Sequence, residues 1–161
     1  MAHLPDEVDM KLPAAQKMKN NALCYKQFSS SVLVLIDSTS RVLMQLRDAR
    51  ASYYPCRWGF FGGGIEPGET PELALKREAY EELRYHPSDP RLLFVRKWVE
   101  HQTSRVCIRH FFADRCLDPA QLVLNEGSDM KWITANDWKS LRVVPYVYET
   151  IGEIFKSLGR R

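Results

Sequence analysis

Apolar and polar residues follow two different periods along this chain, and each period predicts its own kind of element. Apolar and β-branched residues run through 28–36 and, after turn residues at 37–40, again through 41–47, which predicts a β-hairpin. Further strands are expected at 58–61, 92–101, 105–113 and 131–133. Apolar residues three or four apart predict one helix that begins near Pro71 and another over 147–158, and Asn136 is expected to cap a helical turn that ends at Leu141.

The first of these helices carries its own start signals. Thr70 is a good N-cap, Pro71 suits the first helical position because no partner is needed there for an N–H, and Glu72 complements the positive end of the helix dipole. An apolar stripe at every fourth residue predicts the side that faces the core, made of Leu75, Ala79 and Leu83.

Three carboxylates are expected beside that stripe. Glu78, Glu81 and Glu82 stand at i, i+3 and i+4, so they should lie together on a neighbouring helix face, where like charges repel by a few tenths of a kcal/mol per pair. Oxygen ligands without nearby His or Cys favour Mg²⁺ or Mn²⁺ over zinc. A solvated acidic face is the ordinary alternative, but the glycines of 62–64 would let backbone approach a ligand or metal without obstruction.

Composition narrows the class of protein without choosing its chemistry. The 161 residues suit one domain with a single sizeable core, and a formal net charge of +3 is too mild to indicate nucleic acid. The chain has no apolar run of membrane-spanning length and no signal-peptide core at its start, which predicts a cytoplasmic protein. The cysteines form no CxxC pair, so reduced thiols are expected rather than a zinc site.

The segment from Gly63 to Tyr85 resembles the signature of the Nudix hydrolase family, in its MutT-like form. That signature is a Gly, five residues, Glu, seven residues, Arg-Glu, an apolar residue, any residue, Glu-Glu, any residue, Gly and an apolar residue. All of its charged positions are matched here, by Glu69, Arg77, Glu78, Glu81 and Glu82. Two positions depart from the family pattern, since Arg84 replaces the last glycine and Phe61 stands where many members have proline.

This resemblance implies a fold and a division of the chain. It specifies an α/β (α+β) fold, a Nudix-type α/β/α sandwich with a mixed central sheet between helices. Residues 28–161 would form the Nudix hydrolase domain, and residues 1–27 would form an N-terminal extension. The extension could cover the sheet, contact a second subunit or contribute to the substrate pocket, and a homodimer stays open as an alternative.

The resemblance also implies roles for the residues of the signature. Family members use water and a divalent metal to cleave a pyrophosphate linkage within a nucleoside diphosphate joined to another moiety. Glu78 and Glu82 would be catalytic, with Glu78 the candidate base, although the residue that acts as base differs across the family. The resemblance assigns Mg²⁺ or Mn²⁺ to a ligand set of Gly62 (through its carbonyl), Glu78, Glu81 and Glu82. The structural residues of the motif would be Gly63, Glu69 and Arg77, with Arg77 and Glu69 paired between helix and loop, and a direct phosphate contact by Arg77 is the alternative.

One metal-ligand candidate lies outside the signature. Glu126 precedes Trp132 along the chain, much as an additional metal-binding Glu precedes a short Trp-bearing strand in the MutT-type branch. A surface glutamate in a polar loop is the equally weighted alternative.

The segment ahead of the glycines holds the substrate-binding candidates. Arg47 and Arg57 could bind phosphate or could be ordinary surface arginines. Tyr54, together with Tyr53, could offer an aromatic face to a nucleobase, whereas Trp58 is expected to pack in the core.

Two classes of function follow from the resemblance. A metal-dependent pyrophosphohydrolase is the leading one, and a nucleotide-binding sensor without turnover is the other, which loss of a helix glutamate would have favoured. The leading substrate is a (deoxy)nucleoside triphosphate or modified nucleotide, and a nucleotide sugar or ADP-ribose is the alternative, because substrate contacts lie outside the signature. The expected partner is this small nucleotide, with no membrane and no specific nucleic acid.

The end of the first helix is a further expectation. Arg is a good helix former and its charge suits the negative end of the helix dipole. We therefore expect Arg84 to stay helical and the helix to run on toward Tyr85 until Pro87 excludes helical geometry at His86. On this interpretation Arg84→Gly would destabilise the fold slightly.

Overall fold

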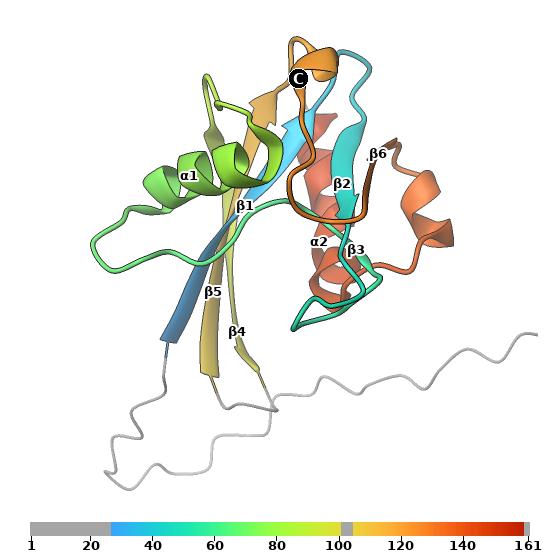
Figure 1. Cartoon of the computed structure of the whole chain (residues 1–161). Helices are drawn as coiled ribbons and strands as arrows, with labels where there is room; N and C mark the ends of the chain where they lie inside the picture. Colours follow the sequence, from blue (N-terminus) through green and yellow to red (C-terminus); the bar gives the residue numbers. More distant parts are fainter. Residues whose placement is uncertain (1–26, 101–104, 160–161) are drawn as a thin grey trace, which may run out of the picture.

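The computed structural model describes residues 27–100 and 105–159 as a six-stranded sheet with one helix on each face (Figure 1). The elements in chain order are β1 (Gln27–Ile36), β2 (Val42–Leu46), β3 (Trp58–Gly59), α1 (Pro71–Leu83), β4 (Arg91–Glu100), β5 (Arg105–Arg115), the 3₁₀ turn η1 (Pro119–Gln121), β6 (Asp129–Ile133), the 3₁₀ turn η2 (Asp137–Ser140) and α2 (Pro145–Leu158). The extension expected over 1–27 lies outside the described residues, except for Gln27. Residues 101–104 lie outside them too, and they include the last residue of the strand expected over 92–101. No helix within the described ranges is long and apolar enough to cross a membrane.

The sheet is mixed, as the resemblance implied. Its order is β3-β2-β1-β5-β4, with β6 also paired to β2, and the β1–β5 pair is parallel while the other strand pairs are antiparallel. The hairpin strands β1 and β2 are in register at Ile36 and Val42 and then diverge. The gap is filled by the segment after β3, which bridges β1 at Leu33–Phe61 and Ser30–Gly64. The glycine loop therefore continues the sheet.

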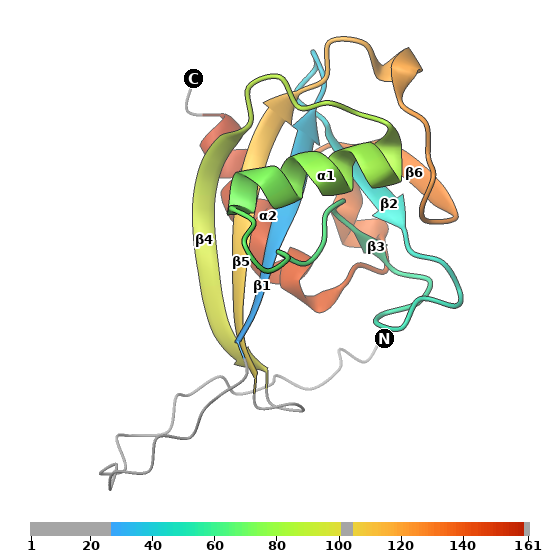
Figure 2. The ribbon, with the colours of Figure 1, turned by 60° about the vertical axis from the view of Figure 1, so that its left-hand side comes forward.

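Two apolar cores explain why β1 is apolar at every position from Val32 to Ile36. Val32, Val34 and Ile36 belong to the core under α2, whereas Leu33 and Leu35 belong to the core under α1. Successive side chains of a strand point to opposite faces, so a strand covered on both sides needs apolar residues throughout. Figure 2 shows α1 in front of the sheet and α2 behind it, which confirms the α/β/α sandwich.

Helix α1 begins where the sequence predicted and buries the predicted stripe. The Thr70 hydroxyl accepts a hydrogen bond of 3.2 Å from the Leu73 N–H, which satisfies one of the unpaired donors of the first turn. Leu75, Ala79 and Leu83 are fully buried in the core under α1.

Some element boundaries differ from the sequence prediction. Helix α2 begins at Pro145 rather than at residue 147, because proline needs no partner in the first turn. The side chain of Asn136 does not cap η2; instead, Asp137 accepts a hydrogen bond of 2.9 Å from the Thr134 N–H. Asn136 is thus the N-cap residue of η2, as predicted, but without a capping hydrogen bond from its side chain.

The predicted end of α1 is also wrong. The helix stops at Leu83, and Arg84 adopts the left-handed conformation with φ 52° and ψ 27°. The Arg84 N–H donates to the Tyr80 carbonyl at 2.9 Å, and the Tyr85 N–H donates to the Ala79 carbonyl at 3.2 Å, the pattern that a left-handed residue closes at a helix end. The turn aims Tyr85 at Asp114, whose carboxylate accepts a 2.6 Å hydrogen bond from the tyrosine hydroxyl. Tertiary packing thus overrides the helix propensity of arginine.

This corrected helix end predicts the order of two variants. Arg84→Gly and Arg84→Ala both remove the guanidinium that stacks 4.9 Å from the Tyr80 ring centroid, but only glycine relieves the left-handed strain. We expect Arg84→Gly to be more stable than Arg84→Ala by about 1 kcal/mol, measured by urea unfolding. An alanine variant as stable as the glycine variant would show that the backbone strain at residue 84 is negligible.

Candidate active site

The glycine loop lies flat against β1. The N–H groups of Ser31 and Leu33 each donate at 2.9 Å, to the carbonyls of Gly63 and Phe61 respectively. Gly62 has φ +123°, and a Cβ there would stand 2.2 Å from the Ser31 carbonyl oxygen. Both the conformation and the close approach of the two strands therefore require glycine at this position.

Gly63 makes room for a carboxylate of α1. A Cβ at Gly63 would lie 2.4 Å from the carboxyl carbon of Glu78, a distance that atoms do not adopt. Glu78 therefore packs its carboxylate directly against the loop backbone. No group within residues 27–100 and 105–159 donates a hydrogen bond to the Gly62 carbonyl. That oxygen is thus compatible with the ligand role that the resemblance implied.

Glu82 is the most buried carboxylate of the site, with an exposed fraction of 3%. One oxygen accepts a 2.7 Å hydrogen bond from the Gly62 N–H, and the other accepts a 3.3 Å hydrogen bond from the side-chain amide of Gln45 on β2. Burial raises the pKa of Glu82 to about 8, and the charges of Glu126 and Glu78 act in the same direction. The folded site is therefore short of positive charge at this residue.

Arg77 joins the loop to the helix, in the pair that the sequence predicted. Its guanidinium holds Glu69 through two hydrogen bonds of 2.8 and 3.0 Å and donates to the Gly64 carbonyl at 2.9 Å. The Arg77 hydrogen bonds lower the pKa of Glu69 to about 2. The remaining nitrogen of Arg77 contacts Glu78 at 2.7 Å and Glu81 at 3.2 Å.

The three helix glutamates differ in their exposure to solvent, which corrects the prediction that they lie together on one helix face. The exposed fraction of the side chain rises from Glu78 at 16% to Glu81 at 55%, whereas Glu82 is inside the protein. Within the described ranges, no three His, Cys, Asp or Glu side chains are already gathered into a metal-binding cluster. The reason is that Arg77 holds Glu78 and Glu81 on one side while Gly62 and Gln45 hold Glu82 on the other.

The loop that carries Glu126 docks on the end of α1. The Asn125 N–H donates to the Glu82 carbonyl at 2.8 Å, and the Asn125 side chain donates to the Glu81 carbonyl at 3.0 Å. These carbonyls have no partner within the helix, so the loop satisfies groups that a helix end leaves open. On the other side of Glu126, the Gly127 N–H donates to Asp48 at 3.2 Å. Glu126 is thereby held near Glu78 and Glu82, and its charge raises the pKa of both.

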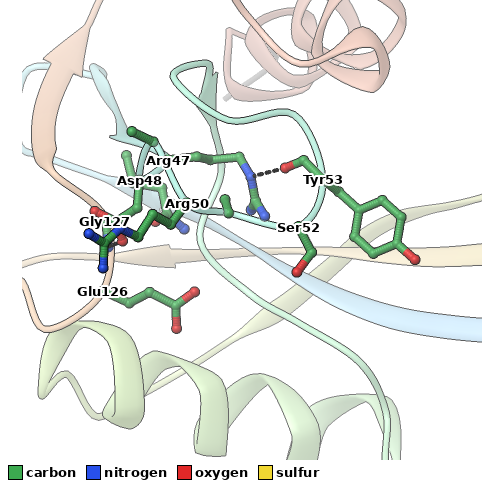
Figure 3. A pocket seen from close by; sticks show the side chains of 10 residues that line it. Arg47, Asp48, Arg50, Ser52, Tyr53, Glu126 and Gly127 are labelled. Carbon is green, nitrogen blue, oxygen red and sulfur yellow. Dashed lines mark hydrogen bonds between the residues drawn. The ribbon is translucent and has the colours of Figure 1, made fainter.

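A cavity of about 810 Å³ opens between this loop and the segment after β2. Figure 3 shows Arg47, Arg50 and Asp48 on one side of the pocket, with Glu126 between them and α1. Arg47 donates a 2.8 Å hydrogen bond to the Tyr53 carbonyl, which fixes the arginine within the pocket wall. The pocket thus combines the cationic side chains of Arg47 and Arg50 with the carboxylates of Asp48 and Glu126, a lining suited to phosphate groups and their counterions.

The structure separates the substrate-binding candidates that the sequence put together. Arg47 lines the pocket, but Arg57 and Tyr54 are not among its lining residues. Arg57 instead donates to the Val143 carbonyl at 3.2 Å. Tyr54, which has φ 52°, is an exposed residue of the loop.

Arg50 and Gln45 are among the pocket residues that sequence reasoning missed. Gln45 had a signal that could have been used, since it is a polar residue inside the apolar strand β2 and is 2% exposed. A buried amide within a strand needs hydrogen-bond partners, and here one partner is Glu82. Arg50 had no such signal, because an arginine in a polar loop is ordinary.

A divalent cation fits the chemistry of this donor set. Glu78, Glu82 and Glu126 are all carboxylates, and no His or Cys belongs to the group. Burial raises the pKa of Glu78 and of Glu82, and repulsion from the neighbouring carboxylates raises both pKa values further. Hard oxygen donors with surplus negative charge are what Mg²⁺ and Mn²⁺ bind. These three residues, with Glu81 and the Gly62 carbonyl, are the residues that would hold the metal.

Comparison with known families agrees with this geometry. The model of the NUDIX domain matches residues 26–151, which include the glycine loop, α1 and the Glu126 loop. The chain belongs to the Nudix family. Nudix hydrolases generally need divalent metal ions, in keeping with the carboxylates of Glu78, Glu82 and Glu126.

Several curated relatives of this chain are RNA pyrophosphohydrolases. An RNA pyrophosphohydrolase from Yersinia enterocolitica is 32% identical over 99 residues, which cover 56% of this chain and 57% of that protein. The match therefore spans little more than half the length of such curated relatives. RNA pyrophosphohydrolases from other Yersinia strains match equally.

Solved structures share the fold at lower sequence identity. The MutT protein from Methanosarcina mazei Go1 has a TM-score of 0.72 at 16% identity, covering 87% of this chain and all 100% of that one. A bifunctional NMN adenylyltransferase/ADP ribose pyrophosphatase from Francisella tularensis, complexed with AMP and a manganese ion, has a TM-score of 0.67 at 22% identity, covering 84% of this chain and 43% of that one. These similarities confirm the Nudix fold of the MutT type.

The raised pKa of Glu82 predicts how the stability of the metal-free protein depends on pH. The folded protein keeps this proton up to about pH 8, whereas the unfolded chain loses it near the ordinary value of 4.5. Between these values the folded state holds more protons, so the free energy of unfolding should fall as pH rises, by up to about 1.4 kcal/mol per pH unit. Urea unfolding in chelator at pH 5 to 8 measures this slope.

The matched control for this prediction is Glu82→Gln, which keeps the size of the side chain and cannot titrate. Its slope over the same pH range should be clearly smaller, with the remainder due to Glu78, whose pKa is raised by burial. Equal slopes for the two proteins would show that Glu82 does not carry a raised pKa.

Proposed function

We propose that this chain is a metal-dependent pyrophosphohydrolase that cleaves a phosphoric anhydride bond of a nucleotide. The observation that carries the proposal is that Glu126 lies near enough to Glu78 and Glu82 for its charge to raise the pKa of both, beside a pocket lined by Arg47 and Arg50. Surplus carboxylate charge next to arginines is a pattern that suits a cation and a polyphosphate bound together, because each neutralises the other. Family membership supports the same chemistry.

The residues divide into two groups in this proposal. Glu82, Glu78, Glu81, Glu126 and the Gly62 carbonyl would hold the metal, which when bound neutralises phosphate charge and lowers the pKa of a water. Glu78 is the candidate base, since its carboxylate lies against the loop and is less buried than that of Glu82. Arg47 and Arg50 would bind the phosphates and orient the scissile bond, while Arg77 and Glu69 hold the loop in place.

The leading substrate is a (deoxy)nucleoside triphosphate or a modified nucleotide, cleaved to a monophosphate and pyrophosphate. The names of the Yersinia relatives favour a second candidate, the 5′-triphosphate end of RNA. The Francisella structure keeps ADP-ribose among the alternatives. A substrate panel with Mg²⁺ and with Mn²⁺, analysed for products, distinguishes these three. Tight nucleotide binding with no product from any substrate would favour the sensor alternative.

Removal of the charge of Glu82 should abolish most of the activity. Glu82→Gln keeps the shape but weakens both metal binding and the stabilisation of phosphate charge, an effect of about a hundredfold or more on kcat/KM. Manganese binding, followed by electron paramagnetic resonance, should weaken in parallel. Glu72→Gln is the control, because Glu72 lies exposed on the same helix and pairs with Lys76. Hydrolysis by Glu82→Gln at the parental rate would disprove the assignment.

Glu126 should act on the metal without acting on the fold. Glu126 is exposed and its side chain makes no hydrogen bond to a described residue, so Glu126→Gln should leave the melting temperature in chelator nearly unchanged. The variant should need a higher Mg²⁺ concentration for half-maximal activity. An unchanged Mg²⁺ dependence would return Glu126 to the role of a surface residue.

A further inference from the structure

Gln45 is a buried amide on a strand that is paired along both of its edges. Strand β2 pairs antiparallel with β3 on one side and with β6 on the other, and Gln45 lies opposite Gly59 and Met130. The residue is 2% exposed and shares a strand face with Leu43, which is buried in the core under α1. The backbone of Gln45 is therefore fixed, and its side chain has little room to move.

The amide of Gln45 has a hydrogen-bond partner among the described residues only at its nitrogen. That nitrogen donates to Glu82 Oε1 at 3.3 Å. No described residue donates to the amide oxygen, which lies against Gly127, where a Cβ would stand only 2.8 Å away. An apolar residue of the same length would fill this space without the cost of burying a polar group. The contact with Glu82 therefore accounts for an amide at this position.

The two donors that hold Glu82 are both neutral. The Gly62 N–H donates to Oε2 at 2.7 Å and the Gln45 amide donates to Oε1, and no Lys, Arg or His of the described residues forms an ion pair with Glu82. Glu78, in contrast, contacts Arg77 at 2.7 Å. A neutral donor orients a carboxylate and leaves its charge for a metal ion, whereas a cationic side chain competes with the metal for the same oxygens.

The loop that carries Glu126 holds the same amide from its other end. Gly127 follows Glu126 directly and packs on the Gln45 amide oxygen. The Ser128 N–H donates at 2.8 Å to the carbonyl of the residue after Gln45, which ties the loop to β2 at this point. The amide therefore has Glu82 at one end and the loop backbone at the other, and it lines the pocket beside Glu126.

We propose that Gln45 is a positioning residue of the metal site, which aims the Glu82 carboxylate at the cation without neutralising it. The proposal rests on the proposed function in that it takes Glu82 as a metal ligand. Residues that hydrogen-bond to a metal ligand fix its orientation, and their loss typically weakens metal binding by about ten- to a hundredfold. Gln45 acts through Glu82 and is not itself a catalytic residue.

The test measures the dissociation constant for Mn²⁺ of the full chain by electron paramagnetic resonance. Gln45→Met keeps the length of the side chain and removes the donor, so the dissociation constant should rise by about tenfold or more. Gln45→Lys puts a cation at the same reach, so it should weaken Mn²⁺ binding further, because the ammonium competes with the ion. Leu43→Val is the control, since it removes a methylene from the same face of β2 and should leave the dissociation constant unchanged.

A double-mutant cycle identifies the residue through which Gln45 acts. In the Glu82→Gln background, the added change Gln45→Met should alter the dissociation constant by less than about twofold, because the carboxylate that the amide orients is gone. In the Glu126→Gln background, the same added change should weaken Mn²⁺ binding as much as it does in the unaltered protein. A residue that only fills the core would have the same effect in both backgrounds.

The unaltered protein supplies a spectroscopic readout that needs no variant. The side-chain amide of Gln45 gives its own nuclear magnetic resonance signals, and Mg²⁺ without any nucleotide should shift them, because the carboxylate that accepts from this amide would then also bind the ion. Signals that do not move under saturating Mg²⁺ overturn the inference, even where the variants do not fold.

Each outcome with the variants also decides the inference. An unchanged dissociation constant for Mn²⁺ in Gln45→Met overturns it, as does an effect in the Glu82→Gln background equal to that in the unaltered protein. Weakened Mn²⁺ binding by Gln45→Met, with no hydrolysis of any substrate by the unaltered protein, would reject the proposed function alone. Hydrolysis by the unaltered protein, with unchanged Mn²⁺ binding in Gln45→Met, would reject this inference alone, and a protein that binds no Mn²⁺ would reject both.

Discussion

The buried carboxylate of Glu82 is the constraint on which the arrangement of this site depends. A carboxylate inside a protein must be matched by hydrogen-bond donors or by a cation. Here the donors come from the glycine loop through Gly62 and from β2 through Gln45. The helix, the loop and the strand are therefore held together by one side chain, and a shift of any of them would leave that side chain unpaired.

The path of the sheet makes this arrangement possible. Strands β1 and β2 separate after Ile36 and Val42, and the chain from Phe61 to Gly64 enters the opening as an additional partner of β1. Glycines at 62 and 63 allow the backbone to pass within contact distance of β1 on one side and of the Glu78 carboxylate on the other. The loop is therefore hydrogen-bonded to β1 as part of the sheet, and it also holds the Glu82 carboxylate of the site.

The sequence predicted the elements and the signature residues because both depend on local pattern. The stripe of Leu75, Ala79 and Leu83 follows from spacing within one helix, and the pair of Arg77 and Glu69 was implied by the resemblance of the segment to the Nudix signature. What it could not predict depends on contacts between distant segments. Arg84 turns left-handed because Tyr85 must reach Asp114, twenty-nine positions away, and Gln45 becomes part of the site because β2 passes beside α1. No local preference of arginine or glutamine contains that information.

The pocket shows the same division between local and distant determinants, with a consequence for specificity. Arg47 and Asp48 are adjacent in sequence but hold different partners, the Tyr53 carbonyl and the Gly127 N–H. The segment after β2 therefore fixes its own arginine and the loop that carries Glu126 at the same time. The residues that line this pocket come from segments outside the signature, while Glu82 is held by the glycine loop. The loop side chains of the pocket can differ without moving Glu82, because Glu82 is held by the glycine loop and by Gln45 of β2. The place of Glu126 depends separately on the hydrogen bond from Gly127 to Asp48.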